Sequence, residues 1–255
     1  MQLTFSRYRI YFILLLFCVP LFIFNIHDFH SWGDDFAQYI KEAQNISSGQ
    51  PYYKSGYVFN PLNRDYAPPQ YPPGYPLLLA PIVKLFGISI KPLLYLNAIL
   101  LSCLLFTFFA YFKKYTSDIV AVCIALTGVY CGFLLDYKQY VLSDLPCTLF
   151  VSLYFLVRRN SLISRKRLIV LVLLALAAML IRTQAILIVV AEAAYLLISV
   201  IRKYYQTKRV SVENASSSFM IVAGTLISYF LITRFVFYTP DSTLKYYAHM
   251  SVTVN

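Results

Sequence analysis

The sequence has 255 residues, of which 59% are hydrophobic and only 13% are charged, whereas an ordinary soluble domain has about 45–50% and about 25%. This composition argues against a soluble fold and favours a chain that lies in a lipid bilayer. The net charge of +11 does not predict a nucleic-acid partner, because Lys and Arg occur in short clusters between apolar runs and not along one basic face.

The first apolar run, Tyr8–Ile26, predicts a transmembrane helix. It follows two arginines, as a signal peptide would, but it is long for a signal-peptide core and no cleavage site with small residues comes after it. We therefore interpret it as a retained first helix. Polar residues interrupt the hydrophobic pattern from His27 to Tyr75, and residues 27–90 are predicted to form a large first outer loop.

A shorter apolar segment, Pro76–Ile88, lies within this outer loop. It is too short to cross a hydrocarbon core of about 30 Å, and it contains Pro81 and Lys84. We expect it to form an interfacial or re-entrant helix. The first outer loop is thus predicted to carry short helices that lie at the membrane surface.

The apolar run Leu168–Ile201 would be about 50 Å long as one helix, which is more than one crossing needs. Arg182-Thr183-Gln184 interrupt it near its middle, so we expect a hairpin of two spans. The chain is therefore predicted to be one all-α transmembrane domain over residues 1–255, with about seven spans and a polar outer tail at 239–255. The remaining spans are expected at Pro92–Phe112, Ile119–Leu135, Leu145–Val157 and Phe219–Phe237.

The basic residues beside the spans alternate between the two sides, which predicts a cytoplasmic N-terminus. This alternation requires Leu168–Ile201 to cross twice and places Arg182 at the outer face. Most acidic residues then lie outside, where we expect any chemistry. The basic residues assigned to the inner side are Arg7, Arg9, Lys113, Lys114, Arg158, Arg159, Arg165, Lys166, Arg167, Arg202, Lys203, Lys208 and Arg209.

An acidic pair, Asp34 and Asp35, stands at the start of a predicted helix in the first outer loop. Asp is a good N-cap residue, so one of the two is expected to cap the helix. The other would project from the first turn beside Tyr39 and Glu42, which follow at helical spacing of four and seven. The alternative is that the pair consists only of a cap and a solvated acid.

Five prolines between Tyr66 and Pro76 restrict the backbone and predict a stiff segment without regular helix. Tyr71, Pro73 and Tyr75 would give this segment an aromatic, preorganised surface at the rim of a pocket for a sugar or an isoprenoid. The alternative is a loop packed on the membrane surface, with its tyrosines at the level of the headgroups.

Together these motifs resemble the GT-C membrane glycosyltransferases, in particular bacterial relatives of the protein mannosyltransferases and lipid A aminoarabinose transferases. The resemblance covers nearly the whole chain and includes Ser143-Asp144, where the family often has Ser-Glu, and Ile181-Arg182-Thr183-Gln184. Its other motifs are Asp35-Phe36-Ala37-Gln38-Tyr39-Ile40, Gly49-Gln50-Pro51-Tyr52, Tyr71-Pro72-Pro73-Gly74-Tyr75-Pro76-Leu77-Leu78-Leu79 and Phe86-Gly87.

The resemblance implies an inverting hexosyl or pentosyl transfer from a dolichyl- or undecaprenyl-phosphate sugar to a lipid, glycan or protein acceptor. It implies a site on the periplasmic side of a bacterial inner membrane, in contact with membrane lipids, and no cofactor or metal. Asp35 would be the general base, with Asp34 as the second choice. Asp144 would line the substrate pocket. Family members are commonly longer, so the resemblance also implies that the tail at 239–255 is incomplete.

The leaving group of such a transfer is a phosphate, which calls for a cation at the membrane surface. Arg182 is the first candidate, because an arginine within an apolar hairpin is costly without a partner and its guanidinium matches phosphate geometry. The alternative for Arg182 is that it extends to the lipid headgroups. Lys84 is the second candidate for the phosphate.

Glu192 is also notable, because an ionisable group within a span is expensive. The resemblance gives it no role, and we expect it to be buried against another helix, neutral or hydrogen-bonded. His27, Asp28 and His30 have loose metal-ligand spacing but are more typical of an ordinary loop. Two other functions remain open for the chain, a transporter or flippase of lipid-linked sugars and an inactive fragment of a transferase.

Overall fold

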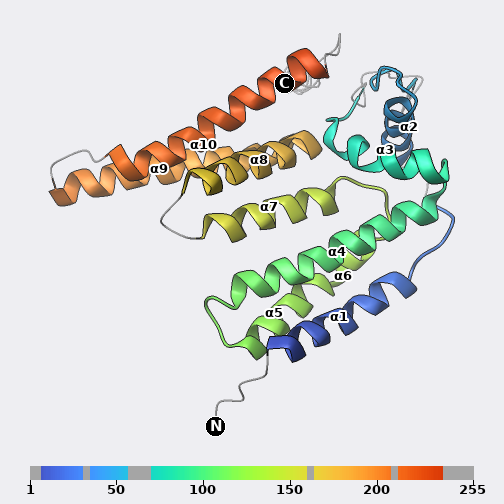
Figure 1. Ribbon diagram of the computed structural model, residues 1–255, viewed down its shortest axis with the longest axis horizontal. Coiled ribbons are helices and arrows are strands. Elements are labelled where there is room, and N and C mark those ends of the chain that lie inside the picture. The colour runs from blue at the N-terminus through green and yellow to red at the C-terminus, as the bar shows by residue number, and fades with distance from the viewer. Residues whose placement is uncertain (1–6, 31–34, 57–69, 160–163, 208–211, 238–255) are drawn as a thin grey trace, which may run out of the picture.

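The computed structural model describes residues 7–30, 35–56, 70–159, 164–207 and 212–237. All regular structure in these ranges is helical (Figure 1). A 3₁₀ turn at Thr183–Ala185 and a π turn at Ile232–Val236 accompany the α-helices. The helices are α1 (Arg7–Ile23), α2 (Phe36–Ser47), α3 (Gly74–Phe86), α4 (Ile90–Phe112), α5 (Asp118–Val129), α6 (Gly132–Tyr137), α7 (Asp144–Arg158), α8 (Arg165–Ile181), α9 (Ile186–Thr207) and α10 (Val212–Leu231).

Three stretches of the described chain are long and apolar enough to cross a membrane: Ile90–Phe112, Thr183–Arg202 and Ser216–Val236. These three match runs in which the sequence predicted spans. α1 and α8 have 17 residues each and α7 has 15, so α7 is about 22 Å long. The expected total of seven spans therefore goes beyond the three helices that length and composition identify.

Three clusters of buried apolar side chains hold the helices together. One joins α1, α4 and α5 to the start of α7, and another joins α7, α8, α9 and α10. The third packs α2 and α3 against the beginning of α4 and the last residue of α8. In Figure 1, α1, α4 and α5 accordingly form the lower part of the molecule and α7 to α10 the upper part.

One span that the sequence predicted, Ile119–Leu135, is not a single helix. The chain leaves the helical conformation after Val129, and Cys131 is extended before α6 begins. The hydroxyl of Tyr130 donates a hydrogen bond to the carbonyl of Phe17 in α1, 113 positions earlier in the chain. This contact ties the break to the neighbouring helix, and only tertiary packing provides it.

The interruption predicted in Leu168–Ile201 is confirmed. α8 ends at Ile181, Arg182 is extended with φ −151° and ψ 125°, and α9 begins at Ile186 after the 3₁₀ turn. α8 and α9 run in opposite directions (Figure 1). The segment is thus a reversal of the chain, with Arg182 at its tip.

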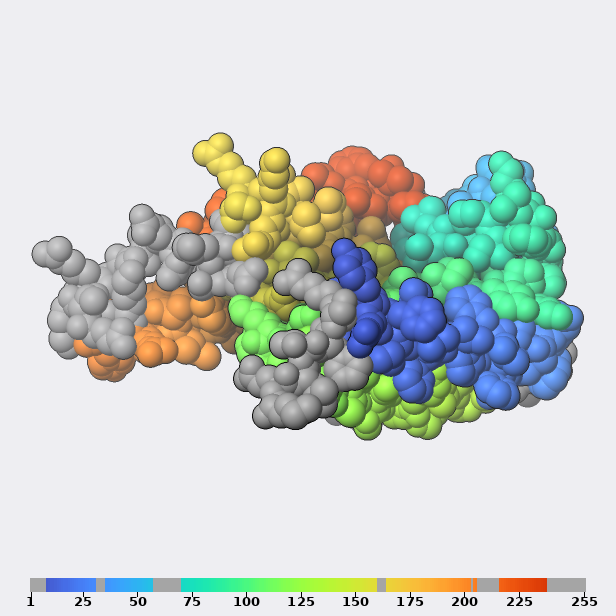
Figure 2. Space-filling model, turned by 60° about the horizontal axis from the view of Figure 1, so that its bottom comes forward, coloured from blue at the N-terminus to red at the C-terminus, as the bar shows by residue number. Residues whose placement is uncertain are grey.

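The two ends of the molecule carry different elements and different charges. α2 and α3 lie at one end and the last turns of α9 at the other (Figure 2). We call the end with α2, α3 and Arg182 the loop end. We call the opposite end the basic end, because Lys113 and Lys114 follow α4 there and Arg159 follows α7. Lys114 Nζ donates to the Arg159 carbonyl at 3.4 Å.

Candidate functional site at the loop end

Asp35 stands directly before α2, in the N-cap position, with φ −71° and ψ 0°. Its side chain makes no capping hydrogen bond. The sequence predicted that one acid of the Asp34-Asp35 pair caps this helix; Asp35 occupies the cap position without such a bond, and Asp34 lies outside the described residues. Because Asp35 precedes Tyr39 by one helical turn, the two side chains interact, and the Asp35 carboxylate adds to the rise in the pKa of Tyr39 that burial causes.

α2 is strongly amphipathic, and its apolar face packs on α3. The ring of Tyr39 lies 4.7 Å from that of Tyr71 and 5.0 Å from that of Tyr75. Tyr75 is completely buried and Pro73 is buried as well. These two residues are therefore core residues, and the predicted aromatic rim reduces to Tyr71, which is half-buried.

The proline-rich segment becomes helical at its end, which contradicts the prediction of no regular helix up to Pro76. α3 begins at Gly74, and proline is tolerated in a first turn because its missing N–H has no helical partner there. A Cβ on Gly74 would lie 2.6 Å from the carbonyl carbon of Leu180. Only glycine allows this approach, which holds the start of α3 against the end of α8, next to Arg182.

Arg182 forms an ion pair with Asp144, the first residue of α7. Its Nη1 also lies 3.4 Å from the hydroxyl of Ser143, and that hydroxyl is 2.9 Å from the hydroxyl of Tyr39. A polar chain thus runs from the tip of the α8–α9 reversal through the start of α7 to α2. The Arg182 and Asp144 side chains are 35% and 30% exposed, so solvent reaches the pair.

The Arg182 guanidinium keeps binding capacity in this arrangement. Both Asp144 and Ser143 contact Nη1, and Nε and Nη2 have no partner among the described residues. From the sequence, the expected partner of Arg182 was a phosphate or the lipid headgroups, whereas in the structure Asp144 pairs with one of its nitrogens. Guanidinium groups present five donors in a planar fork, so an additional anion can bind the remaining edge.

Glu42 is a second acid of the site and is fully buried. Its Oε1 accepts hydrogen bonds from Gln38 Nε2 and from the backbone N–H of Tyr71, both at 3.0 Å. Burial raises the pKa of Glu42 to about 8. Its Oε2 and the hydroxyl of Tyr75 have no hydrogen-bond partner within the described ranges. Buried polar atoms without partners are rare and often mark functional positions.

We call Asp35, Tyr39, Glu42, Ser143, Asp144 and Arg182 the Arg182 cluster. Lys84, the second candidate for a phosphate, does not belong to it. It lies in the last turn of α3 and is exposed, about 15 Å along the helix from Gly74. The structure thus separates the two cations that the sequence analysis had grouped in one role.

Sequence reasoning did not foresee the residues that position Ser143 and Asp144. Asn97 of α4 donates to the carbonyls of Lys138 and Tyr140 at 3.1 and 2.7 Å. The ring of His30 accepts from the Val141 N–H at 3.0 Å. His30 is buried, although the sequence suggested an ordinary loop residue. The one feature of the sequence that could have indicated this role is the position of His30 shortly after the end of an apolar helix.

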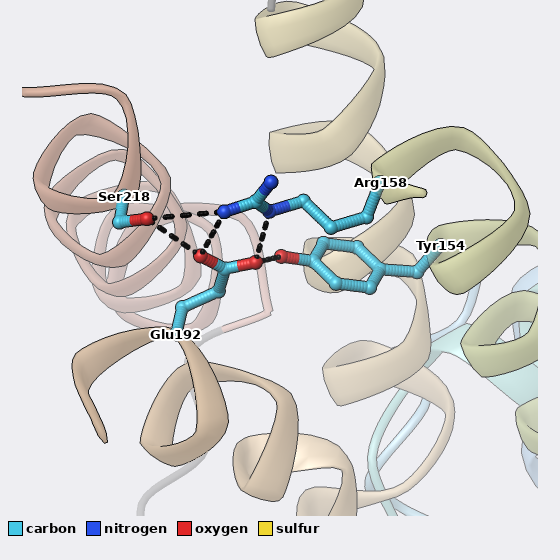
Figure 3. A network of polar contacts seen from close by, with 4 residues as sticks. All are labelled: Tyr154, Arg158, Glu192 and Ser218. Carbon is cyan, nitrogen blue, oxygen red and sulfur yellow. Dashed lines mark hydrogen bonds and ion pairs between the residues drawn. The ribbon is translucent and has the colours of Figure 1, made fainter. Parts of the chain in front are cut away.

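A second polar cluster lies away from the loop end and joins α7, α9 and α10 (Figure 3). Glu192 Oε1 accepts from Tyr154 at 2.5 Å and from Arg158 Nε at 2.6 Å, and its Oε2 accepts from Ser218 at 2.8 Å. The prediction that Glu192 is buried and hydrogen-bonded is confirmed. Its ion pair with Arg158 replaces the neutral form that the sequence analysis allowed.

Comparisons of the chain with protein-family models, with curated proteins and with solved structures found no match. Among the described residues, no three His, Cys, Asp or Glu side chains are grouped in a way that could hold a metal ion.

Proposed function

We propose that the chain is an integral membrane glycosyltransferase that transfers a sugar from a polyprenyl phosphate to a lipid, glycan or protein acceptor. The observation that carries this proposal is the Arg182 cluster. It combines a general-base candidate, Asp35, with a partly exposed arginine, Arg182, that has free hydrogen-bond donors. The residues of the cluster come from α2, α7 and the α8–α9 reversal, which are distant in the sequence. Base and anion-binding cation are the two groups that such a transfer requires.

In the proposed reaction the acceptor hydroxyl attacks the anomeric carbon of the donor sugar. A new carbon–oxygen bond forms as the bond from the anomeric carbon to the phosphate oxygen breaks, and the polyprenyl phosphate leaves with the electron pair. Asp35 takes the proton of the hydroxyl. Arg182 stabilises the negative charge on the departing phosphate through Nε and Nη2. Attack opposite the leaving group inverts the anomeric configuration.

Asp144 has a supporting role in this proposal. Its carboxylate fixes Nη1 of Arg182, so the guanidinium is oriented before the donor binds. Ser143 connects the same nitrogen to Tyr39 and so relates the position of the cation to α2. Tyr71 lies next to the cluster, with its ring 4.7 Å from that of Tyr39, and it can contact a sugar or an isoprenoid because it is only half-buried.

A transporter of lipid-linked sugars is the less suitable alternative. Transporters bind their substrates at helices that are broken near the middle of the membrane. The interruption at Arg182 instead lies where α8 and α9 reverse direction, beside α2 and α3, which we propose to be interfacial helices. The location favours a site at the membrane surface.

For the topology we propose seven spans with the N-terminus in the cytoplasm and the loop end on the periplasmic side of a bacterial inner membrane. α5 and α6 would cross together as one broken span, and the short α7 would cross where the protein thins the bilayer. Labelling of single cysteines on a cysteine-free background tests this. Cysteines at positions 34, 35 and 182 should react with an impermeant reagent from outside. Labelling of position 182 only from the cytoplasm would refute both the topology and the site.

The direct test of the function is transfer by the purified protein in proteoliposomes. Synthetic undecaprenyl-phosphate donors with radiolabelled hexoses or pentoses are supplied together with lipid, glycan and peptide acceptors, and the release of undecaprenyl phosphate is measured. We expect one donor class to bind and to be consumed, and the Asp35→Asn variant to bind it without consuming it. Failure of the wild type to bind any of these donors would contradict the proposal.

A further inference from the structure

The basic end contains a cavity of about 440 Å³ between α4, α7 and α9. Its lining includes Arg158 and Arg159 from the end of α7 together with Ala191 and Tyr195 of α9. A second cavity, of about 250 Å³, lies between α4 and α7. Both are lined by Tyr111 and Phe155, so the two adjoin and form one two-lobed space.

The larger lobe is lined mostly by apolar and aromatic side chains but carries an excess of positive charge. Arg158 is engaged by Glu192 through Nε and Nη2, and its guanidinium lies 4.8 Å from the ring of Tyr195. Arg159 has no carboxylate partner in the described chain. Its Nη1 donates to the Ala110 carbonyl, and its buried Nε has no hydrogen-bond partner there. Two arginines and one carboxylate leave this lobe with one uncompensated cation.

The smaller lobe is mostly apolar. Phe108 and Phe112 of α4 and Phe155 of α7 line it, and the polar Thr107 and Ser152 complete it. The hydroxyl of Thr107 already donates to the Cys103 carbonyl within its own helix. A cationic lobe beside an apolar lobe suits an amphiphile that has an anionic head and a hydrocarbon chain.

We propose that this two-lobed space binds an anionic phospholipid, with its phosphate at Arg159 and one acyl chain against Phe108 and Phe112. Guanidinium groups form strong, directional hydrogen bonds with phosphate oxygens. Basic pockets between membrane helices on the cytoplasmic side are typical sites for anionic headgroups. The site is independent of sugar transfer, since it lies at the opposite end from the Arg182 cluster.

The test uses the delipidated protein in detergent and native mass spectrometry to measure bound lipid. Phosphatidylglycerol is titrated against phosphatidylcholine with the same chains, and inorganic phosphate is added as a competitor. We expect a preference of about tenfold for phosphatidylglycerol, which inorganic phosphate does not remove. Equal affinity for the two lipids would overturn the proposal. So would displacement by inorganic phosphate alone, because the space would then be a site for the free anion.

Two variants locate the preference within the molecule. Arg159→Gln should reduce it by about fivefold, whereas Lys166→Gln, in the exposed first turn of α8 at the same end, should not change it. Ala191→Phe keeps every charge but fills the larger, cationic lobe, so it should abolish the bound phosphatidylglycerol; Ala193→Phe, exposed and outside the lining, is its control. Retention of the full preference in both Arg159→Gln and Ala191→Phe would refute the site, and Ala191→Phe decides alone if Arg159→Gln does not fold.

Discussion

The Glu192 network and the Arg182 cluster both place an arginine beside a carboxylate, but they differ in how completely their polar atoms are satisfied. Tyr154, Arg158 and Ser218 occupy both oxygens of Glu192, and the Glu192 side chain is only 6% exposed. At the loop end, Arg182 and Asp144 are about one-third exposed. Glu42 and Tyr75 there keep buried polar atoms that have no partner in the described residues.

The difference separates a structural role from a functional one. A buried, fully hydrogen-bonded ion pair that connects α7, α9 and α10 fixes the arrangement of those helices, and it leaves no capacity for a ligand. A partly exposed pair with remaining donors can bind and release an anion. Glu192 was a functional candidate in the sequence because ionisable groups are costly in a membrane. That cost does not by itself indicate a catalytic or binding role. A functional role is indicated where polar atoms remain without hydrogen-bond partners and are accessible to a ligand.

The largest effect on stability should come from removing one member of the Glu192 network. Glu192→Ala leaves Arg158 without its countercharge, and we expect the free energy of unfolding to fall by about 3–5 kcal/mol. Asp144→Ala, at the solvent-exposed pair, should cost about 1 kcal/mol or less. Unfolding in mixed detergent micelles measures both. Equal losses in the two variants would show that the Glu192 network and the Arg182 cluster do not differ in how strongly their ion pairs stabilise the fold.

The second-largest effect concerns the rate of sugar transfer at the Arg182 cluster. Asp35→Asn keeps the shape of the side chain but cannot accept a proton, so the rate of sugar transfer should fall by about 10²-fold or more while donor binding survives. Asp34→Asn should change the rate by only a few fold. A loss restricted to Asp34→Asn would exchange the roles of the two acids, and wild-type activity in both variants would remove the base from this pair.

A smaller change is expected in donor affinity. Arg182→Ala should weaken the binding of a polyprenyl-phosphate sugar by about tenfold or more, since a charge-assisted hydrogen bond contributes about 1.5–3 kcal/mol. Arg182→Lys should restore only part of the affinity, because a point charge loses the planar fork. Lys84→Ala is the matched control, as Lys84 is an exposed cation outside the cluster. Binding is measured by titration with a fluorescent donor. If Lys84→Ala lost more affinity than Arg182→Ala, the phosphate would be assigned to α3.

The smallest effect is a dependence of stability on pH at the loop end. The pKa of Glu42 is raised to about 8 from 4.5, so between these values the folded chain holds a proton that the unfolded chain has lost. The free energy of unfolding should therefore decrease as pH rises from 5 to 8, by about 1 kcal/mol or more. Glu42→Gln cannot ionise and should flatten this profile. Unfolding curves at several pH values provide the measurement, and parallel profiles for the two proteins would contradict a buried neutral Glu42.

Local patterns predicted a large part of the helical structure. Long apolar runs located α4, α9 and α10, and the acidic pair Asp34-Asp35 indicated where α2 begins. The interruption at Arg182 was also visible, because a charged residue within an apolar run marks a place where a membrane helix ends. The break after Val129 was not visible, since it depends on the contact of Tyr130 with α1.

The candidate site was only partly accessible to the same reasoning. The sequence alone named five residues of the site: Asp35, Tyr39, Glu42, Asp144 and Arg182. Nothing in it predicted that Arg182 pairs with Asp144, or that Lys84 lies at the far end of α3, away from Arg182. The positioning roles of His30 and Asn97 were also missed. Both residues act through backbone groups of the loop before α7, and backbone contacts of this kind leave no signature in residue types.

By itself, the sequence determined the helical character of the described ranges and the three helices that are long and apolar enough to cross a membrane, because the length and polarity of each segment are local properties that a bilayer selects directly. Only the tertiary structure decided which charges meet. Glu192 finds Arg158 34 positions away, and Arg182 finds Asp144 at the start of another helix. Those pairs form only because particular helices are neighbours. Close packing decides which helices are neighbours, as in the contact of Gly74 with Leu180. Such packing joins residues that are far apart in the sequence, so no local sequence pattern predicts it.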